Sequence, residues 1–353
     1  MPGGGVLAPL RYLPVSWARF WRPQTVALDL GTDAFRLAYV GNRSLVEVPA
    51  RGVLDPRGRI VAIGKRAQHM EERLPDNWRL AHPVEVGHLS HPAVARQLVR
   101  LLLSQVQRRR LWKPRAHLAE PSGMTPMERT VFAGFLRDLP LRECFYVEPA
   151  FAQAVGAGVQ PRTLAGLMVI DVGAQRTAGT VLSYGRPVLV QQWGVGGHHF
   201  TLALRGAVED AHRLRVPLSE IERWKRAAGD ARIAGQDRLT GRLVTLELPE
   251  AFALKAMEGP MSMLLESLGE LFSRCSAALR IDVQQQGVLL VGGGASLPSL
   301  RHRLCAELGL DVRLPEQPAR CLVRGLARLA QHDSAAAVAA AEEPLADLFP
   351  LEA

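Results

Sequence analysis

The chain has 353 residues, 48% of them hydrophobic and 22% charged, which excludes a disordered protein and allows a sizeable core in two domains. A formal net charge of +9 predicts attraction to anionic partners, either nucleic acid or anionic lipid. The four cysteines have no CxxC spacing, which argues against a zinc site or a disulfide framework and predicts a reducing, cytoplasmic location.

Residues 1–24 precede the first predicted strand and lack the long apolar core of a signal peptide, because Arg11 and two prolines interrupt it. No segment is apolar for long enough to span a bilayer. Trp17, Phe20 and Trp21 would share one face of a short helix, which is typical of an interfacial membrane anchor. An arm packed on its own domain and a disordered tail remain open as alternatives.

Two stretches have the same apolar-apolar-Asp-apolar-Gly order at the end of a predicted strand. The first places Asp29, Gly31 and Thr32 at the bend of a hairpin, and the second does the same with Asp171 and Gly173. Glycine lets a backbone approach a ligand, and such a turn can hold phosphate, although ordinary hairpin turns also have this pattern. The repetition indicates an internal duplication, with two similar α/β domains facing one ligand across a cleft.

A third predicted strand ends in three glycines, Gly292, Gly293 and Gly294. The pattern predicts a helix over residues 297–308, with Pro298 in its first turn. Bare backbone at the N-terminus of a helix suits a nucleotide.

Together, the three motifs resemble the two phosphate motifs and the adenosine motif of the actin/Hsp70/sugar-kinase superfamily. The closest similarity is to the bacterial actins, the MreB family, over about residues 24–330. Further phrases that carry this resemblance are residues 121–129, 147–150, 195–197, 222–225 and 239–241. The resemblance implies an α/β actin-like fold, with two duplicated ribonuclease-H-like domains, a smaller subdomain inserted in each, and a nucleotide cleft between them.

The resemblance also implies domain boundaries. They are residues 1–24 for an N-terminal arm, 25–48, 82–158 and 320–332 for subdomain IA, 49–81 for IB, 159–194 and 259–319 for IIA, 195–258 for IIB, and 333–353 for a C-terminal tail. The alanine-rich tail has the composition of either a loose helix or a disordered peptide.

ATP and Mg²⁺ are the cofactors that the resemblance implies, with Asp29 and Asp171 holding the metal ion through water. The implied cofactor contacts are Asp29, Gly31, Thr32, Asp33, Asp171, Gly173, Arg176, Glu222, Lys225, Gly292, Gly293 and Gly294. Glu222 and Lys225 lie three residues apart on a predicted helix, so a surface ion pair is the alternative to contact with the adenosine end.

Two interpretations apply to Thr125 and Glu128. Locally, Thr125, Pro126 and Glu128 form a capping box at the start of a predicted helix. Through the resemblance, Glu128 is the catalytic glutamate that positions the water attacking the γ-phosphate, with Thr125 beside it. The sequence leaves both interpretations open.

Several positions depart from the family pattern. Gly173 is followed by larger side chains and lacks a nearby acid, Asp33 adds negative charge near the phosphates, Phe35 replaces a hydroxyl, and His198 stands where an acid is usual. Arg176 can compensate in part by meeting a phosphate itself. A slow ATPase is therefore what the resemblance implies, and the sequence leaves hydrolysis open.

Leu111 and Trp112 follow a predicted helix over residues 91–106 and lie among five cations between Arg108 and Arg115. Tryptophan favours the bilayer interface, and cations favour an anionic leaflet. The segment is also similar to the membrane-insertion loop of MreB proteins, whereas the alternative is a pair of side chains plugged into a core.

The resemblance implies a membrane-associated bacterial actin homologue that binds ATP and polymerises head to tail, acting as a cell-shape or positional cytoskeletal scaffold. It places the protein in the cytoplasm, peripherally on the inner face of the membrane. An anionic membrane surface and other membrane-bound morphogenesis proteins are the implied partners, and nucleic acid is disfavoured. A non-hydrolysing adaptor and a soluble superfamily phosphotransferase are the alternatives.

Overall fold

The computed structural model describes residues 24–40, 44–106, 113–119, 124–160, 166–227, 232–297 and 299–339. Within these ranges the strands form two five-stranded sheets and three smaller ones. Three groups of predictions fall outside the described residues: the anchor residues Trp17, Phe20 and Trp21, the loop pair Leu111 and Trp112, and the end of the tail. No described helix is both long and apolar enough to cross a membrane.

The first five-stranded sheet has the order β10-β9-β1-β2-β3. Its strands are β1 (Thr25–Leu30), β2 (Ala34–Tyr39), β3 (Leu45–Pro49), β9 (Arg115–Ala119) and β10 (Glu143–Val147). β1, β2 and β3 form an antiparallel meander, while β9 and β10 run parallel to β1. The meander follows from the tight turn after Asp29, because a short connection can join only antiparallel strands.

The second sheet repeats this topology. Its order is β13-β12-β11-β17-β18, with an antiparallel meander followed by two parallel strands. These strands are β11 (Leu167–Val172), β12 (Thr177–Ser183), β13 (Arg186–Trp193), β17 (Val288–Val291) and β18 (Val312–Arg313). β11 carries Asp171 at the same place as β1 carries Asp29, so the predicted duplication is confirmed at the level of strand order.

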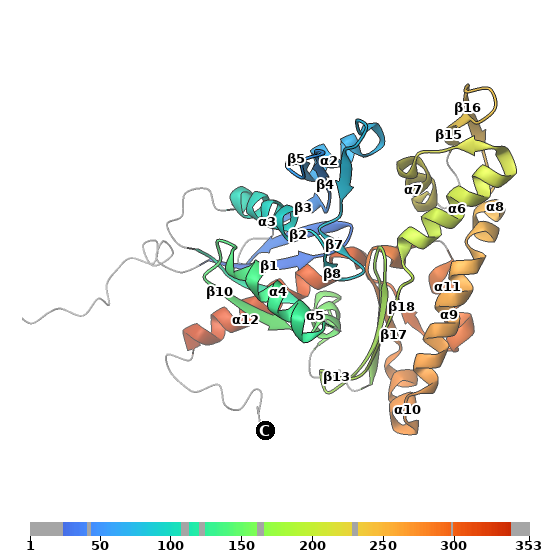
Figure 1. The fold of residues 1–353 in the computed structure, drawn as a ribbon. Helices are drawn as coiled ribbons and strands as arrows, with labels where there is room; N and C mark the ends of the chain where they lie inside the picture. Colours follow the sequence, from blue (N-terminus) through green and yellow to red (C-terminus); the bar gives the residue numbers. More distant parts are fainter. Residues whose placement is uncertain are drawn as a thin grey trace, which may run out of the picture.

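Helices cover both sheets (Figure 1). α5 (Pro149–Gly156) and α12 (Cys321–Ala339) lie between them, whereas α9 (Glu258–Ser273), α10 (Ala277–Gln286) and α11 (Leu300–Leu308) lie on the far side of the second sheet. α5 packs on β11 through small buried side chains, and α12 packs on β1 through Val323 and Leu326. Since α5 and α12 contact each other along their length, they join the two domains.

The remaining helices of the first half cover its sheet or lie in its insertion. α3 (Pro92–Val106) confirms the helix predicted over residues 91–106, and α4 (Pro126–Arg137) begins where the predicted capping box places it. β4 (Gly52–Leu54), β5 (Ile60–Ile63) and β6 (Arg79–Ala81) form a small sheet with α2 (Gly64–Met70) and the 3₁₀ turn η1 (Glu71–Arg73). A short hairpin of β7 (Val84–Glu85) and β8 (His88–Leu89) follows.

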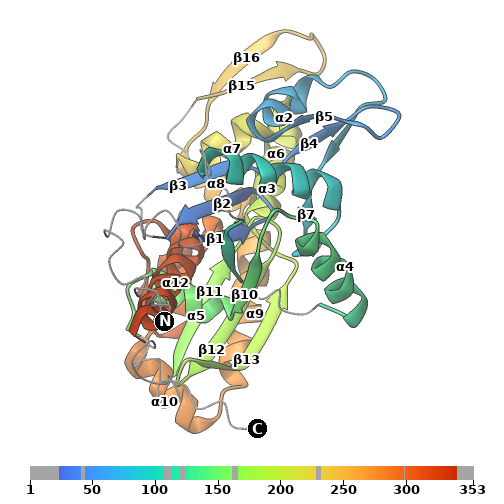
Figure 2. The ribbon, with the colours of Figure 1, turned by 90° about the vertical axis from the view of Figure 1, so that its left-hand side faces the viewer.

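The second half has an insertion of its own. β14 (Leu214–Arg215), β15 (Arg232–Asp237) and β16 (Leu243–Glu247) form its sheet, with α6 (Gly197–His212), α7 (Leu218–Arg226) and α8 (Glu250–Ala256) beside it. Figure 2 shows the two insertions at the same end of the molecule, and Figure 1 shows them apart, with α2, β4 and β5 on one side and the β15–β16 hairpin on the other. The two halves therefore present their insertions on either side of one opening.

The segment after the three glycines differs from the prediction. The glycine run enters a 3₁₀ turn, η3 (Gly293–Ser296), and α11 begins only at Leu300, while Pro298 lies outside the described residues. Gly292 has φ of +88°, and an ideal Cβ there would lie 2.5 Å from the carbonyl oxygen of Val172. The predicted helix start at residue 297 was therefore wrong, because these glycines allow close packing on the end of β11 and do not lead straight into a helix.

Candidate functional site

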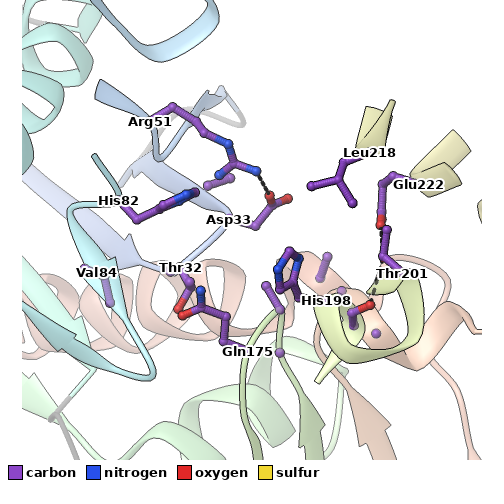
Figure 3. A pocket seen from close by; sticks show the side chains of 18 of the residues that line it. Thr32, Asp33, Arg51, His82, Val84, Gln175, His198, Thr201, Leu218 and Glu222 are labelled. Carbon is purple, nitrogen blue, oxygen red and sulfur yellow. Dashed lines mark hydrogen bonds and ion pairs between the residues drawn. The ribbon is translucent and has the colours of Figure 1, made fainter. Parts of the chain in front are cut away.

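A cavity of about 1670 Å³ lies between the two halves of the chain. It is bounded by the β1–β2 turn, the β11–β12 turn, the glycine run and the two insertions. Figure 3 shows Thr32, Asp33 and Arg51 on one side of it and His198, Thr201 and Glu222 on the other. The volume exceeds the range of about 300–1,000 Å³ typical of small-ligand pockets, so the cavity can hold a nucleotide-sized molecule.

All of the residues predicted to contact the cofactor line this cavity. They are Asp29, Gly31, Thr32, Asp33, Asp171, Gly173, Arg176, Glu222, Lys225, Gly292, Gly293 and Gly294. They come from four separate segments of the chain, which the fold gathers around one space. Contact of each residue with a nucleotide stays a prediction, but their convergence is a structural fact.

The two motif acids lie at the inner end of the cavity and are both buried. Burial raises the pKa of Asp29, an effect that the Arg36 guanidinium opposes. Arg36 Nη1 donates to Asp29 Oδ2 over 3.2 Å. Burial likewise raises the pKa of Asp171, and the side-chain amide of Gln153 opposes it by donating to Asp171 Oδ2 over 2.6 Å.

These contacts test whether the two acids fit Mg²⁺. One carboxylate oxygen of Asp29 already accepts from a permanent cation, and one oxygen of Asp171 accepts from an amide. Among the residues that the structure describes, no group of three or more His, Cys, Asp or Glu side chains is placed to hold a metal ion. The donor set therefore does not fit the predicted magnesium site, because a guanidinium lies where the metal ion would be attracted.

Asp33 is also neutralised. Arg51 Nη2 lies 3.1 Å from Asp33 Oδ1 (Figure 3), and Arg51 Nε lies 3.2 Å from Glu71 Oε2. This partner could not be predicted from local sequence, because Arg51 is 18 residues away and lies beyond two strands. The negative charge that Asp33 was expected to leave beside the phosphates is thus balanced by Arg51.

Glu222 and Lys225 form an ion pair in which the lysine is buried and the glutamate is one-third exposed. The Lys225 side chain is only 6% exposed. Its Nζ donates to Glu222 Oε2 over 2.6 Å, to Thr201 Oγ1 over 2.8 Å and to the Gly197 carbonyl oxygen over 2.8 Å. Burial lowers the pKa of Lys225, although Glu222 opposes this effect. The network ties the N-terminal turn of α6 to α7 at the wall of the cavity.

Thr125 and Glu128 form the predicted capping box of α4. The backbone N–H of Thr125 donates to Glu128 Oε2 over 2.8 Å, and Thr125 Oγ1 accepts from the Glu128 backbone. The other carboxylate oxygen of Glu128 lies 2.8 Å from His88 Nδ1. Neither residue is among those lining the cavity. The local interpretation is confirmed, while the catalytic interpretation stays a prediction that would require Glu128 to leave this cap.

Contacts across the cavity were not visible in the sequence. Gln175 Oε1 accepts from the backbone N–H of Val86 over 2.8 Å, and Glu72 Oε1 accepts from Ser219 Oγ over 2.6 Å. Arg176, predicted to meet a phosphate, donates to Gln192 over 2.9 Å. An ideal Cβ on Gly87 would lie 2.4 Å from Arg176 Nη1, so the β7–β8 hairpin rests against this guanidinium. The two halves thus touch on both sides of the cavity.

A comparison with family models decides the relationship of this chain. A model described as "MreB/Mbl protein" matches residues 23–337. The chain belongs to the MreB/Mbl family. Among curated proteins, it is 27% identical over 317 residues to the cell shape-determining protein MreB of Escherichia coli, covering 85% of this chain and 91% of that protein.

Two solved structures are similar to this chain in fold. MreB5 of Spiroplasma citri bound to AMPPNP superposes with a TM-score of 0.82 at 20% identity, covering 90% of this chain and 99% of that one. A MamK double helical filament gives a TM-score of 0.73 at 17% identity, covering 88% and 99%. The predicted actin-like α/β fold is therefore confirmed.

Proposed function

We propose that this bacterial actin homologue binds ATP in the cavity and polymerises into filaments that act as a cell-shape or positional scaffold. The observation that carries the proposal is the convergence of both Asp-x-Gly turns, the glycine run and the Glu222–Lys225 network on one cavity. The phosphates would lie between the two turns, and the adenosine end between α7 and the glycine run. A relative crystallised with AMPPNP and another seen as a filament support the proposal.

The proposed subdomain boundaries are those that the resemblance to the family implies. Subdomains IB and IIB would be the two insertions that flank the opening, and IA and IIA the two domains built on the five-stranded sheets. Magnesium is not part of the proposal, because Arg36 already neutralises Asp29.

Gly293 provides a sharp test of the cavity. It lines the cavity, and an ideal Cβ there would meet no atom within 4 Å. Gly293→Leu should therefore fill the nucleotide space without a clash in the fold, whereas Gly259→Leu, at an equally open position on α9 away from the cavity, is the matched control. We expect ATP to raise the thermal midpoint of the wild type and of Gly259→Leu, but not that of Gly293→Leu.

Two outcomes would contradict nucleotide binding in the cavity. If no adenine or guanine nucleotide at millimolar concentration shifts the wild-type midpoint, the cavity is not a nucleotide site. An ATP-induced shift that survives unchanged in Gly293→Leu would place the nucleotide elsewhere.

Assembly is proposed to be head to tail, a heterologous contact that extends into a filament and does not close into a ring. A non-hydrolysable ATP analogue should support it about as well as ATP. Light scattering and negative-stain microscopy of micromolar protein on lipid would show this. A monomer or a closed dimer under every nucleotide and lipid condition would refute the filament.

We further propose that the filament lies on the cytoplasmic face of the membrane, through Leu111 and Trp112 and the face formed by Trp17, Phe20 and Trp21. Weak anchors on many subunits add up through avidity. Flotation with anionic liposomes should fall with salt, and should fall sharply in Leu111→Ser/Trp112→Ser. If that double variant still floats equally after residues 1–24 are also deleted, neither segment is an anchor. Other membrane-bound morphogenesis proteins would join it there.

A non-hydrolysing adaptor is the second candidate function. It is favoured by one observation: Glu128, the proposed water-positioning residue, is held by Thr125 and His88 outside the cavity. Turnover that is measurable in the wild type and lost in Glu128→Ala would reject this candidate, because a cap alone has no part in hydrolysis.

A further inference from the structure

A row of alternating charges crosses the first sheet beneath the cavity. Asp29 on β1, Arg36 on β2 and Glu47 on β3 are direct cross-strand partners, so their side chains leave the sheet on the same face. Arg36 Nη1 lies 3.2 Å from Asp29 Oδ2, and Arg36 Nη2 lies 3.1 Å from Glu47 Oε1. Arg320 extends the row, with its Nε 3.6 Å from Glu47 Oε2. Arg36 is therefore fixed from both sides by carboxylates.

The Arg36 guanidinium borders the first Asp-x-Gly turn. An ideal Cβ on Gly31 would lie 3.7 Å from Asp29 Oδ1 and 3.9 Å from Arg36 Nη1. Arg36 and Asp29 thus flank the bare backbone on which the proposed phosphate would rest, and both line the cavity. The guanidinium is part of the wall that a polyphosphate would meet.

One donor of Arg36 is left over. Its Nε is buried and has no hydrogen-bond partner within the described part of the chain, while the side chain as a whole is 13% exposed. Because Nε itself has no exposed surface, a ligand would meet the part of the guanidinium that lines the cavity, where a phosphate oxygen is a suitable acceptor. The ion pairs hold the Arg36 side chain in place at the wall of the cavity, beside the space that an anionic ligand would fill.

The charges at this site also disfavour a divalent metal ion. Arginine stays protonated at any physiological pH, so the Asp29–Arg36 pair carries no net charge. A metal ion recruited to Asp29 would have to approach this fixed positive charge and share the carboxylate with it. Arg36 thus offsets the charge of Asp29 before any ligand arrives, although it also pairs with Glu47.

We propose that Arg36 is the resident cation of the cleft: its guanidinium takes the place of a divalent metal ion beside Asp29 and contacts the polyphosphate, so the protein binds adenine nucleotide without Mg²⁺. The inference rests on the proposed nucleotide binding, and it specifies that the nucleotide binds without a metal ion. It also assigns a role to a strand residue outside the three motifs.

The test is a calorimetric titration of the full chain with ATP, once with Mg²⁺ and once with excess EDTA. We expect the wild-type dissociation constants in the two media to agree within about threefold. Arg36→Met should lose about tenfold or more in EDTA and regain affinity in Mg²⁺, because the Asp29 carboxylate, no longer paired with Arg36, can then recruit the metal ion. Arg51→Met is the matched control, since Arg51 lines the same cavity and also pairs with two carboxylates. Its affinity should respond to EDTA as little as that of the wild type.

A double variant serves as a control for misfolding of Arg36→Met, because that single substitution leaves the Asp29 carboxylate buried without its cation. Asp29→Asn/Arg36→Met has no carboxylate to recruit a metal ion, so its affinity should be weak and equal in both media. Strong dependence on Mg²⁺ in that variant would overturn the inference.

Three further results have distinct meanings. Wild-type binding that is lost in EDTA would overturn the role of Arg36 while leaving nucleotide binding intact. Equal affinities in both media for Arg36→Met would show that another group supplies the charge, and would also overturn it. No ATP binding by the wild type in either medium would reject the proposed nucleotide site itself.

Discussion

Replacing Gly325 by alanine should destabilise the protein, although alanine is the better helix former. Gly325 lies on α12 where that helix crosses α5, and an ideal Cβ there would lie 1.6 Å from the carbonyl oxygen of Ala152. Ordinary van der Waals contact at such positions is 3.4–4 Å. Gly156 on α5 faces the same crossing, with its ideal Cβ 1.8 Å from the carbonyl oxygen of Cys321. Neither helix can accept a methyl group without moving its backbone.

The magnitude follows from two opposing effects. Forcing the helices apart disturbs the buried contacts of Ala152, Val323 and Leu326, and overpacking of this kind costs about 3 kcal/mol. Alanine in a helix interior regains about 1 kcal/mol relative to glycine. The free energy of unfolding should therefore fall by about 2 kcal/mol. Since α12 packs on β1 and α5 on β11, the two Asp-x-Gly turns should also shift relative to each other, and ATP affinity should decrease.

Urea denaturation followed by circular dichroism measures the first effect, and titration with ATP the second. Gly206→Ala is the matched control, because Gly206 lies within α6 and an ideal Cβ there meets no atom within 4 Å. That control should gain stability, by up to about 1 kcal/mol. If Gly325→Ala is as stable as Gly206→Ala, the close crossing of α5 and α12 does not exist in solution and the reasoning fails.

Three other substitutions test local features. Thr125→Ala should lower the free energy of unfolding by about 1 kcal/mol through loss of the α4 cap, and an unchanged urea midpoint would contradict the capping box. Lys225→Met should cost about 2 kcal/mol, because it removes the buried cation that donates to Glu222, Thr201 and the Gly197 carbonyl, while Arg226 remains paired with Glu222. If Lys225→Arg is equally destabilised, packing and not charge is the cause. Arg303 lowers the pKa of Glu258 from 4.5 to about 2, so this carboxylate stabilises the fold above pH 4.5 and loses that effect as the pH falls toward 2. Glu258→Gln should reduce the slope of stability against pH in that window, and an identical slope would refute the pairing.

Local sequence patterns were enough to predict the elements that carry the site. The apolar run into Asp29 and its copy before Asp171 gave the two hairpins, and the capping box gave the start of α4. These predictions succeeded because strand alternation and helix capping depend on residues only a few positions apart. The helix predicted after the three glycines forms, but it begins at Leu300 and not at about residue 297, since glycine allows both a helix start and close packing, and only the neighbouring β11 decides between them.

By itself, the sequence determined that this chain is a duplicated actin-like protein, and which residues would line its cleft. Only the tertiary structure decided the charge of that cleft. Arg36 meets Asp29 through the register of β1 and β2, Arg51 meets Asp33 across 18 residues, and Glu72 meets Ser219 across 147. Strand register and domain packing determine these pairs, because they bring together residues that are far apart in the sequence and share no helical or strand periodicity. The ligands that the cleft accepts therefore depend on contacts that appear only when the two halves are folded and facing each other.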